Sequence, residues 1–248
     1  LLYLQTSLRD TSVKWEKSIA HWIQRDPTFV AAGDASQVAG GGLCDELEHW
    51  FDVQWTDRVQ RGCKLKSTDP GYVHVNMLEY VVVLIQLAAS IVALETGYAK
   101  KMLGATLPTI PHLLVWTDNK VSKSWSNRVT STSQSAQPLL GIQSALLQRS
   151  NVGFGSDHVA GEDNDGPDFI SRPGRAPKPA LTHFDRSLQI ITNDKRLKSW
   201  HCFRPSVEFT SLVESMLFTE HWVDPPNLPK TLGRFEHGVS TGSLFVRM

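Results

Sequence analysis

The chain has 248 residues, of which 41% are hydrophobic and 20% are charged, as expected for a globular protein that buries a sizeable core. Lys and Arg together number 25, as do Asp and Glu, so no overall basic field attracts nucleic acid and any such binding needs a local patch. The three cysteines lack paired spacing, and no glycosylation sequon or signal peptide is present, which argues against a secreted protein and predicts an intracellular one, cytoplasmic or nuclear.

The first 27 residues predict a helical extension that precedes the core. Apolar side chains recur at helical spacing among charged ones between Thr11 and Arg25, and Asp26-Pro27 ends the pattern. Because the chain begins at Leu1 rather than at Met, we expect it to derive from a longer polypeptide, with a region missing upstream.

Three strands with short connections are predicted next, which favours an antiparallel meander. The first runs from Thr28 to Ser36 and carries Asp34 near its end, the second passes through Gly40-Gly41-Gly42, and the third runs from His49 to Trp55. The three glycines lack the spacing of a phosphate-binding loop, so we expect them to permit close approach to the strand backbone.

A polar loop, 61–72, leads into a long helix predicted from Asn76 to Leu94. Its apolar run is too long for an ordinary strand. The run is also interrupted by Gln86 and Ser90 and is too short for a membrane span, so we predict a buried helix in the middle of a layered fold and no membrane partner. Asn76 and Glu79 have the spacing of a capping box, which gives Glu79 a purely structural interpretation.

The stretch from Leu113 to Asn119 predicts a buried strand that ends abruptly in Asp118 and Asn119. Open α/β sheets form their sites at the carboxyl ends of strands, so Asp118 is a candidate for chemistry. An aspartate between a strand and a helix also serves as a helix N-cap. Both interpretations of Asp118 stay open on this evidence alone.

Helices and one strand alternate downstream of this segment. Helices are predicted from Asn119 to Arg128 and from Pro138 to Arg149, followed by a weak strand from Asn151 to Val159. An acidic loop then leads into a short helix near Asp168. This order of elements indicates an α/β domain.

Residues 173–248 predict a linker followed by a partly helical tail. The linker from Pro173 to Pro179 is rich in Pro, Gly, Lys and Arg, a helix is predicted from Ser206 to Phe218, and Pro-rich coil follows from Asp224. No chemistry is evident in this tail, which either packs against the core or connects to a further domain.

Four short motifs occur in order along this pattern. They are Asp34-Ala35-Ser36, Asn76-Met77-Leu78-Glu79, Trp116-Thr117-Asp118-Asn119, and a stretch from His158 to Arg172 that contains Gly161, Asn164, Asp168 and Ser171. Together they resemble the ribonuclease H domain of retroelement reverse transcriptases, most closely of DIRS-like retrotransposons, over residues 28–172. The resemblance implies a ribonuclease H-like α/β fold, whose mixed five-stranded sheet has three antiparallel strands, then two parallel ones, flanked by helices. It also implies an upstream reverse transcriptase domain of the same polyprotein.

The resemblance assigns four carboxylates as catalytic residues and as ligands of two Mg²⁺ or Mn²⁺ ions: Asp34, Glu79, Asp118 and Asp168. Hydrolysis of a phosphodiester needs an activated water and stabilised charge on two oxygens, which two ions about 4 Å apart provide. Mg²⁺ prefers oxygen ligands, and clustered carboxylates repel one another until a metal binds. The sequence contains no zinc-binding motif.

The fourth carboxylate has alternatives nearby. Asp163 and Asp165 lie close to Asp168, which we prefer because the flanking Asn and Ser-Arg of the motif fix the register. Pro167 stands where the family has Ala, which a first helical turn tolerates but which can change the aim of Asp168. His158 lies where a strand is predicted to end, and we interpret it as structural.

The resemblance implies hydrolysis of the RNA strand of RNA/DNA hybrids, with 5′-phosphate and 3′-hydroxyl products. Such hybrids are recognised through shape, phosphates and 2′-hydroxyls, which requires few base-specific residues. Candidate contacts lie beside Asp34 or just after Asp118, and they are Ser36, Asn119, Lys120, Lys123 and Arg128. A solvated helix face explains the three cations equally well.

Two rival functions follow from the same pattern. A retroelement remnant without activity would keep the fold and bind nucleic acid or protein. A transposase or resolvase of the same superfamily would need different spacing around the last carboxylate, so we favour it less.

Overall fold

The computed structural model describes residues 26–104, 107–129, 131, 133–172, 195–219 and 226–237. The helix predicted between Thr11 and Arg25 lies outside this part of the chain, as does the linker predicted from Pro173 to Pro179.

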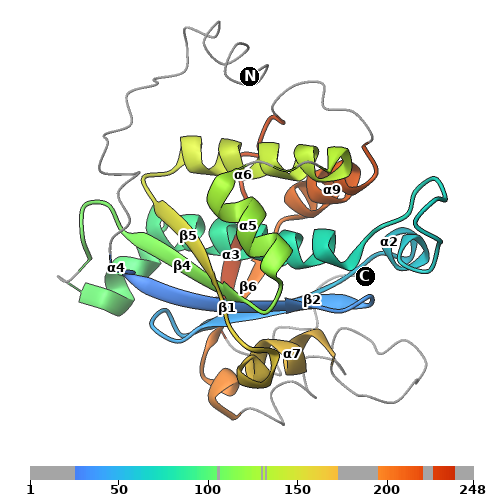
Figure 1. Ribbon diagram of the computed structural model, residues 1–248. Coiled ribbons are helices and arrows are strands. Elements are labelled where there is room, and N and C mark those ends of the chain that lie inside the picture. The colour runs from blue at the N-terminus through green and yellow to red at the C-terminus, as the bar shows by residue number, and fades with distance from the viewer. Residues whose placement is uncertain are drawn as a thin grey trace, which may run out of the picture.

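A seven-stranded mixed sheet forms the middle of the structure, with helices on both faces (Figure 1). Its strands lie in the order β5-β4-β1-β2-β3-β6-β7. Strands β1, β2 and β3 are antiparallel neighbours, and β4 and β5 continue from β1 as parallel strands, which are the predicted directions for these five. The bounds are β1 (Phe29–Ala35), β2 (Ala39–Cys44), β3 (His49–Gln54), β4 (His112–Thr117), β5 (Gly153–His158), β6 (His201–Pro205) and β7 (Gly233–His237).

The sheet has seven strands rather than the five that the sequence predicts. Strand β6 pairs in parallel with β3, and β7 pairs antiparallel with β6. Strand β6 ends at Pro205 and β7 begins at Gly233. Pro and Gly are uncommon inside strands, so the sequence pattern does not indicate either strand. The ring of Phe203 on β6 is buried and lies 5.2 Å from that of Phe235 on β7, so tertiary packing defines these strands.

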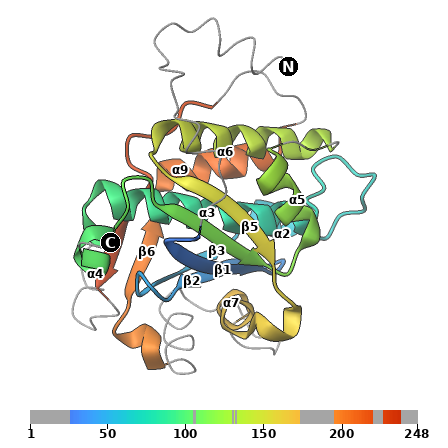
Figure 2. The ribbon, with the colours of Figure 1, turned by 60° about the vertical axis from the view of Figure 1, so that its left-hand side comes forward.

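One long helix lies directly on a face of the sheet and is covered in turn by other helices. Helix α3 packs on β1 and β2 with α5 beside it, α6 and α9 lie on its outer side, and α7 lies on the opposite face of the sheet (Figures 1 and 2). The helices are α2 (Asp57–Gly62), α3 (Val75–Glu95), α4 (Tyr98–Leu103), α5 (Lys120–Arg128), α6 (Gln137–Arg149), α7 (Asp165–Ser171) and α9 (Val207–Leu217), with short 3-10 turns η3 (Gln134–Ala136), η4 (Gly161–Asp163) and η5 (Lys195–Lys198).

The position of α3 between the sheet and α6 explains why it is apolar around much of its circumference. By length and hydropathy α3 could cross a membrane, but 94% of its most apolar window is buried inside the protein. This helix therefore has the character of a core helix, as the sequence predicts.

Glycines in the first two strands let helices pack closely on both faces of the sheet. A Cβ atom at Gly33 of β1 would overlap the side chain of Val82 in α3, and one at Gly41 of β2 would overlap that of Ile170 in α7. The contact at Gly41 confirms the prediction that the glycines of the second strand permit close approach, and Gly33 adds a second such position that the sequence did not indicate. Helix α7 is thereby held directly against β2, in which Gly41 lies opposite Asp34 of β1.

Candidate metal centre

Three carboxylates from three different elements meet at one edge of the sheet. In the parallel pair of β1 and β4, Ala32 lies opposite Trp116, so Asp34 and Asp118 come level at the carboxyl ends of the two strands. The first turns of α3 bring Glu79 to the same edge. One carboxylate oxygen from each of the three residues lies within 4.8 Å of the other two. Asp34 and Glu79 are buried, whereas Asp118 is half-buried.

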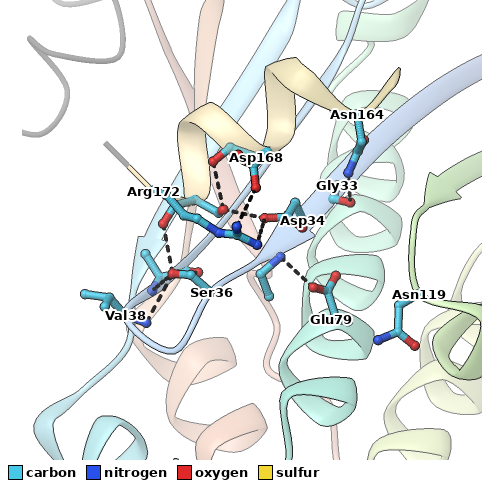
Figure 3. Close-up of polar contacts among 12 residues, drawn as sticks. Gly33, Asp34, Ser36, Val38, Glu79, Asn119, Asn164, Asp168 and Arg172 are labelled. Carbon is cyan, nitrogen blue, oxygen red and sulfur yellow. Dashed lines mark hydrogen bonds and ion pairs between the residues drawn. The ribbon is translucent and has the colours of Figure 1, made fainter. Parts of the chain in front are cut away.

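Glu79 does not cap its own helix, which corrects the capping-box interpretation. The N-cap of α3 is His74, whose Nδ1 accepts a hydrogen bond from the Asn76 backbone N–H at 3.0 Å. Oε1 of Glu79 instead accepts from the backbone N–H of Ala35 at 3.1 Å (Figure 3). Oε2 of Glu79 is buried without a hydrogen-bond partner in the described part of the chain. A buried carboxylate oxygen of this kind needs a proton or a cation.

Burial and mutual repulsion shift the pKa values of Glu79 and Asp34. Burial, followed by the charges of Asp34 and Asp118, raises the pKa of Glu79 to about 9. Burial also raises the pKa of Asp34, although a hydrogen bond from Ser171 and the charge of Arg172 lower it. Three ionised carboxylates are therefore unfavourable here without a cation between them.

The fourth predicted carboxylate, Asp168, lies on the other side of Asp34 rather than within the group of three. Its Oδ1 is 3.0 Å from Nη1 of Arg172, and Nη2 of the same guanidinium is 3.7 Å from Oδ2 of Asp34 (Figure 3). Asp163 and Asp165, the alternatives to Asp168, are both exposed. Asp168 is thus the member of this acidic stretch that is linked to Asp34.

Hydrogen bonds fasten the end of α7 to the strand that carries Asp34. The hydroxyl of Ser171 donates to Oδ2 of Asp34, and the hydroxyl of Ser36 donates to the Ser171 carbonyl at 3.0 Å. Oγ of Ser36 also accepts from the backbone N–H groups of Val38 and Ala39, at 3.2 and 3.1 Å. The Ser36 hydroxyl, predicted to contact nucleic acid, is therefore engaged in forming the turn between β1 and β2 and in docking α7.

Asn119, rather than Asp118, caps the helix that follows β4. Its Oδ1 accepts from the backbone N–H groups of Val121 and Ser122, both at 3.0 Å. Its Nδ2 donates to Oδ1 of Asn76 at 2.9 Å. The capping interpretation of Asp118 is wrong, and its carboxylate faces Asp34 and Glu79 instead.

The predicted cations lie along α5 with different surroundings. Lys120 and Arg128 are exposed, whereas Nζ of Lys123 forms an ion pair with Oδ1 of Asp157 on β5 at 2.5 Å. His158 is exposed at the end of β5, and its backbone N–H donates to Asp157 at 2.7 Å. Lys120, next to the Asp118 end of β4, is the exposed cation of the three that lies closest in sequence to the carboxylates.

Sequence reasoning used Asn164 and Arg172 only to fix the register, yet both belong to the site region. Asn164 is buried, its Nδ2 donates to the Gly33 carbonyl at 3.4 Å, and its Oδ1 has no partner among the described residues (Figure 3). Arg172 contacts two of the four predicted carboxylates. Its place four residues after Asp168, at helical spacing for an ion pair, was the signal that could have identified it.

The donor set suits a hard divalent cation. The three convergent groups offer carboxylate oxygens, and Oε2 of Glu79, which has no partner within the described ranges, would gain one from such an ion. No family model, curated protein or solved structure matches the chain.

Proposed function

We propose that this protein is a Mg²⁺- or Mn²⁺-dependent ribonuclease H that hydrolyses the RNA strand of RNA/DNA hybrids and derives from a retrotransposon polyprotein. The observation that carries the proposal is the convergence of Asp34, Glu79 and Asp118, with a buried Glu79 oxygen that has no hydrogen-bond donor among the described residues. The order of the four sequence motifs supports it. So do the directions of β1 to β5, which are those expected for a ribonuclease H-like fold.

Each of the two ions would be held by its own set of carboxylates. Asp34, Glu79 and Asp118 would hold one divalent ion, and Asp34 with Asp168 a second. Bound ions of this kind activate a water and stabilise charge on the attacking and leaving oxygens of a phosphodiester.

The surroundings of the carboxylates fit a substrate that is bound through its backbone. The link from Asn119 to Asn76 keeps the Asp118 and Glu79 elements together, and exposed Lys120 is available to the phosphates of a hybrid. Since the chain has no net charge, contacts of this local kind have to supply the electrostatic attraction.

Cleavage assays with the full chain test the proposal. Wild-type protein with Mg²⁺ should cut the RNA strand of a hybrid and leave double-stranded DNA and single-stranded RNA intact. Asp118→Asn should reduce the rate by about 100-fold or more, because it removes a ligand charge from the ion site. Asp45→Asn is the matched control, since Asp45 is an exposed aspartate that follows β2 near the start of β1, at the opposite end of the strands from Asp34. Failure of the wild type to cut a hybrid, or undiminished cutting by Asp118→Asn, would refute the proposal.

One observation favours a second candidate, an inactive remnant that binds nucleic acid. Asp168 is engaged by Arg172 instead of standing with the other three carboxylates. A module of this kind would bind a hybrid in Mg²⁺ without cutting it. Parallel binding and cleavage measurements on the same hybrid separate the two candidates.

A further inference from the structure

We propose that the Arg172 guanidinium, which forms ion pairs with Asp34 and Asp168, must be displaced from them by the second divalent ion, so that the two ions bind in order. This inference rests on the proposed function and concerns the regulation of the same site.

One guanidinium, that of Arg172, forms ion pairs with both Asp34 and Asp168. Its Nη1 lies 3.0 Å from Asp168 and its Nη2 lies 3.7 Å from Asp34, and these two aspartates come from different elements. The Asp34 side chain is 2% exposed while that of Arg172 is 51% exposed, so the cation covers the buried aspartate from the solvent side. A divalent ion that binds both aspartates has to take the place of the guanidinium.

Two of the three ligands of the first ion have no such competitor. Neither Glu79 nor Asp118 forms an ion pair with any residue in the described ranges. The first ion, at Asp34, Glu79 and Asp118, therefore meets the guanidinium only through its longer contact of 3.7 Å with Asp34, whereas the second ion must also replace the closer contact of 3.0 Å with Asp168.

The ion pair between Arg172 and Asp168 is weak enough for a divalent ion to displace. Arg172 is half-exposed, and ion pairs of that kind change an equilibrium constant by about fivefold or less. Arg172 thus lowers the affinity for the second ion without preventing its binding. The displaced guanidinium is then free beside the site, where its planar donors suit a phosphate.

Counting bound Mn²⁺ by electron paramagnetic resonance, without nucleic acid, tests the inference. Wild-type full chain should bind one ion tightly and a second more weakly, and Arg172→Gln should tighten the second by about fivefold and the first by less. Arg172→Lys, which keeps the charge, should stay close to the wild type. Arg234→Gln is the matched control, because Arg234 is an exposed arginine that pairs with Glu236 on β7 at the far edge of the sheet.

A second measurement needs no loss of the arginine. In the wild type, the Nε–H resonance of Arg172, assigned with Arg172→Lys, should show its larger shift with the second equivalent of Mg²⁺ and a smaller one with the first, because the first ion binds Asp34 but leaves Asp168 paired. An unchanged second affinity in Arg172→Gln, or a resonance whose larger shift comes with the first equivalent, would overturn the inference.

The outcomes also separate this inference from the proposed function. A protein that shows ordered ion binding but never cuts a hybrid loses the proposed function and keeps the competition. A protein that cuts a hybrid and binds both ions alike in the wild type and in Arg172→Gln loses the competition alone. A protein that binds no Mn²⁺ loses both.

Discussion

The side-chain amide of Asn119 donates a hydrogen bond to the side-chain oxygen of Asn76 at 2.9 Å, which ties the end of β4 to the start of α3. Asp118 precedes the first of these residues and Glu79 follows the second by three positions. The hydroxyl of Ser122 adds a bond to the Asn76 backbone carbonyl at 3.1 Å. The spacing of two candidate ligands therefore depends on a contact between their neighbours.

Asn76→Ala should weaken Mg²⁺ binding and slow hydrolysis by about tenfold, because the two elements lose a direct link while the cap of α5 is kept. The free energy of unfolding should fall by only about 1 kcal/mol. Titration calorimetry and cleavage rates give both quantities. Asn127→Ala is the control, since the Asn127 amide pairs with the Ser156 backbone on β5 at 2.8 Å, away from α3. Equal losses of Mg²⁺ affinity in both variants would contradict this prediction.

Glu79→Gln should stabilise the metal-free protein, and the gain should grow with pH. The pKa of Glu79 is raised to about 9 in the folded protein and is about 4.5 when the chain is unfolded. Stability from this group is thus fully present below pH 4.5 and is lost progressively as the pH rises towards 9. Gln does not titrate, so the variant should gain up to about 1 kcal/mol per pH unit between pH 5 and pH 8.

Thermal unfolding in chelator at pH 5 and pH 8 measures this gain. Saturating Mg²⁺ should reverse the order of the two proteins, because the ion stabilises the carboxylate and not the amide. A gain that is the same at both pH values would show that the pKa of Glu79 is not raised.

Much of the sheet and three of the candidate ligands could be predicted from the sequence. The runs that end in Asp34 and Asp118 are apolar and stop at a polar residue, so both the strands and their ends are marked. The length of the apolar run around Gln86 distinguishes α3 from a strand. Since parallel strands end at one edge, the convergence of their terminal carboxylates follows from the order of elements.

Other features depend on contacts that the local sequence does not encode. Strand β6 owes its place to the packing of Phe203 against Phe235, which lie 32 positions apart in the chain. His74 caps α3 instead of Asn76, and both residue types accept hydrogen bonds, so composition does not choose between them. The direction of the Arg172 side chain depends on how α7 docks. The close approach of Ile170 to Gly41 determines that docking, and the motif does not.

Asp168→Asn should reduce hydrolysis of a hybrid by about 100-fold, whereas Asp163→Asn and Asp165→Asn should leave it within about twofold of the wild type. Asp168 is joined to Asp34 through Arg172, while the other two aspartates are exposed. Single-turnover cleavage rates at saturating Mg²⁺ measure the effects. A large loss of hydrolysis rate in Asp163→Asn or Asp165→Asn would show that this residue, rather than Asp168, is the fourth ligand.

Gly41→Ala should destabilise the protein by about 1–3 kcal/mol and slow hydrolysis, because the added methyl group overlaps Ile170 and pushes α7 away from Asp34. Gly155→Ala is the control, since its added methyl group would meet its nearest neighbour at an ordinary 3.6 Å. Because the overlap involves the Cβ atom of Ile170 at 2.7 Å as well as its Cγ2, shortening Ile170 would not relieve it, and α7 itself has to move. Chemical denaturation compares the two glycine variants, and equal losses of stability in both would show that the overlap is not the cause.

Gln86 and Ser90 are both polar and buried in α3, yet replacing them should have opposite effects. Nε2 of Gln86 donates to the backbone carbonyls of Ala32 and Leu43 at 2.9 and 3.1 Å, so the side chain joins α3 to β1 and β2. The hydroxyl of Ser90 has no partner among the described residues.

Burial lowers the pKa of His49 to about 4, so its ring is neutral near pH 7, and Nε2 lies 3.3 Å from the Gln86 side-chain oxygen. That oxygen can only accept, so Nε2 of His49 carries the proton. Gln86→Leu removes the acceptor of this bond as well as the donor to two carbonyls. It should therefore cost about 1–3 kcal/mol although it makes the core more apolar.

Ser90→Ala should be neutral or slightly stabilising, because it removes a buried hydroxyl that makes no hydrogen bond within the part of the chain that the structure describes, and it places a better helix former in α3. Urea denaturation of the metal-free protein compares the two variants through their midpoints at equal slope. The slope matters because a change in it would signal a different unfolded or native state rather than a different stability. If Gln86→Leu is as stable as the wild type, the amide is not needed to satisfy the strand carbonyls, and α3 is held to the sheet by apolar packing alone.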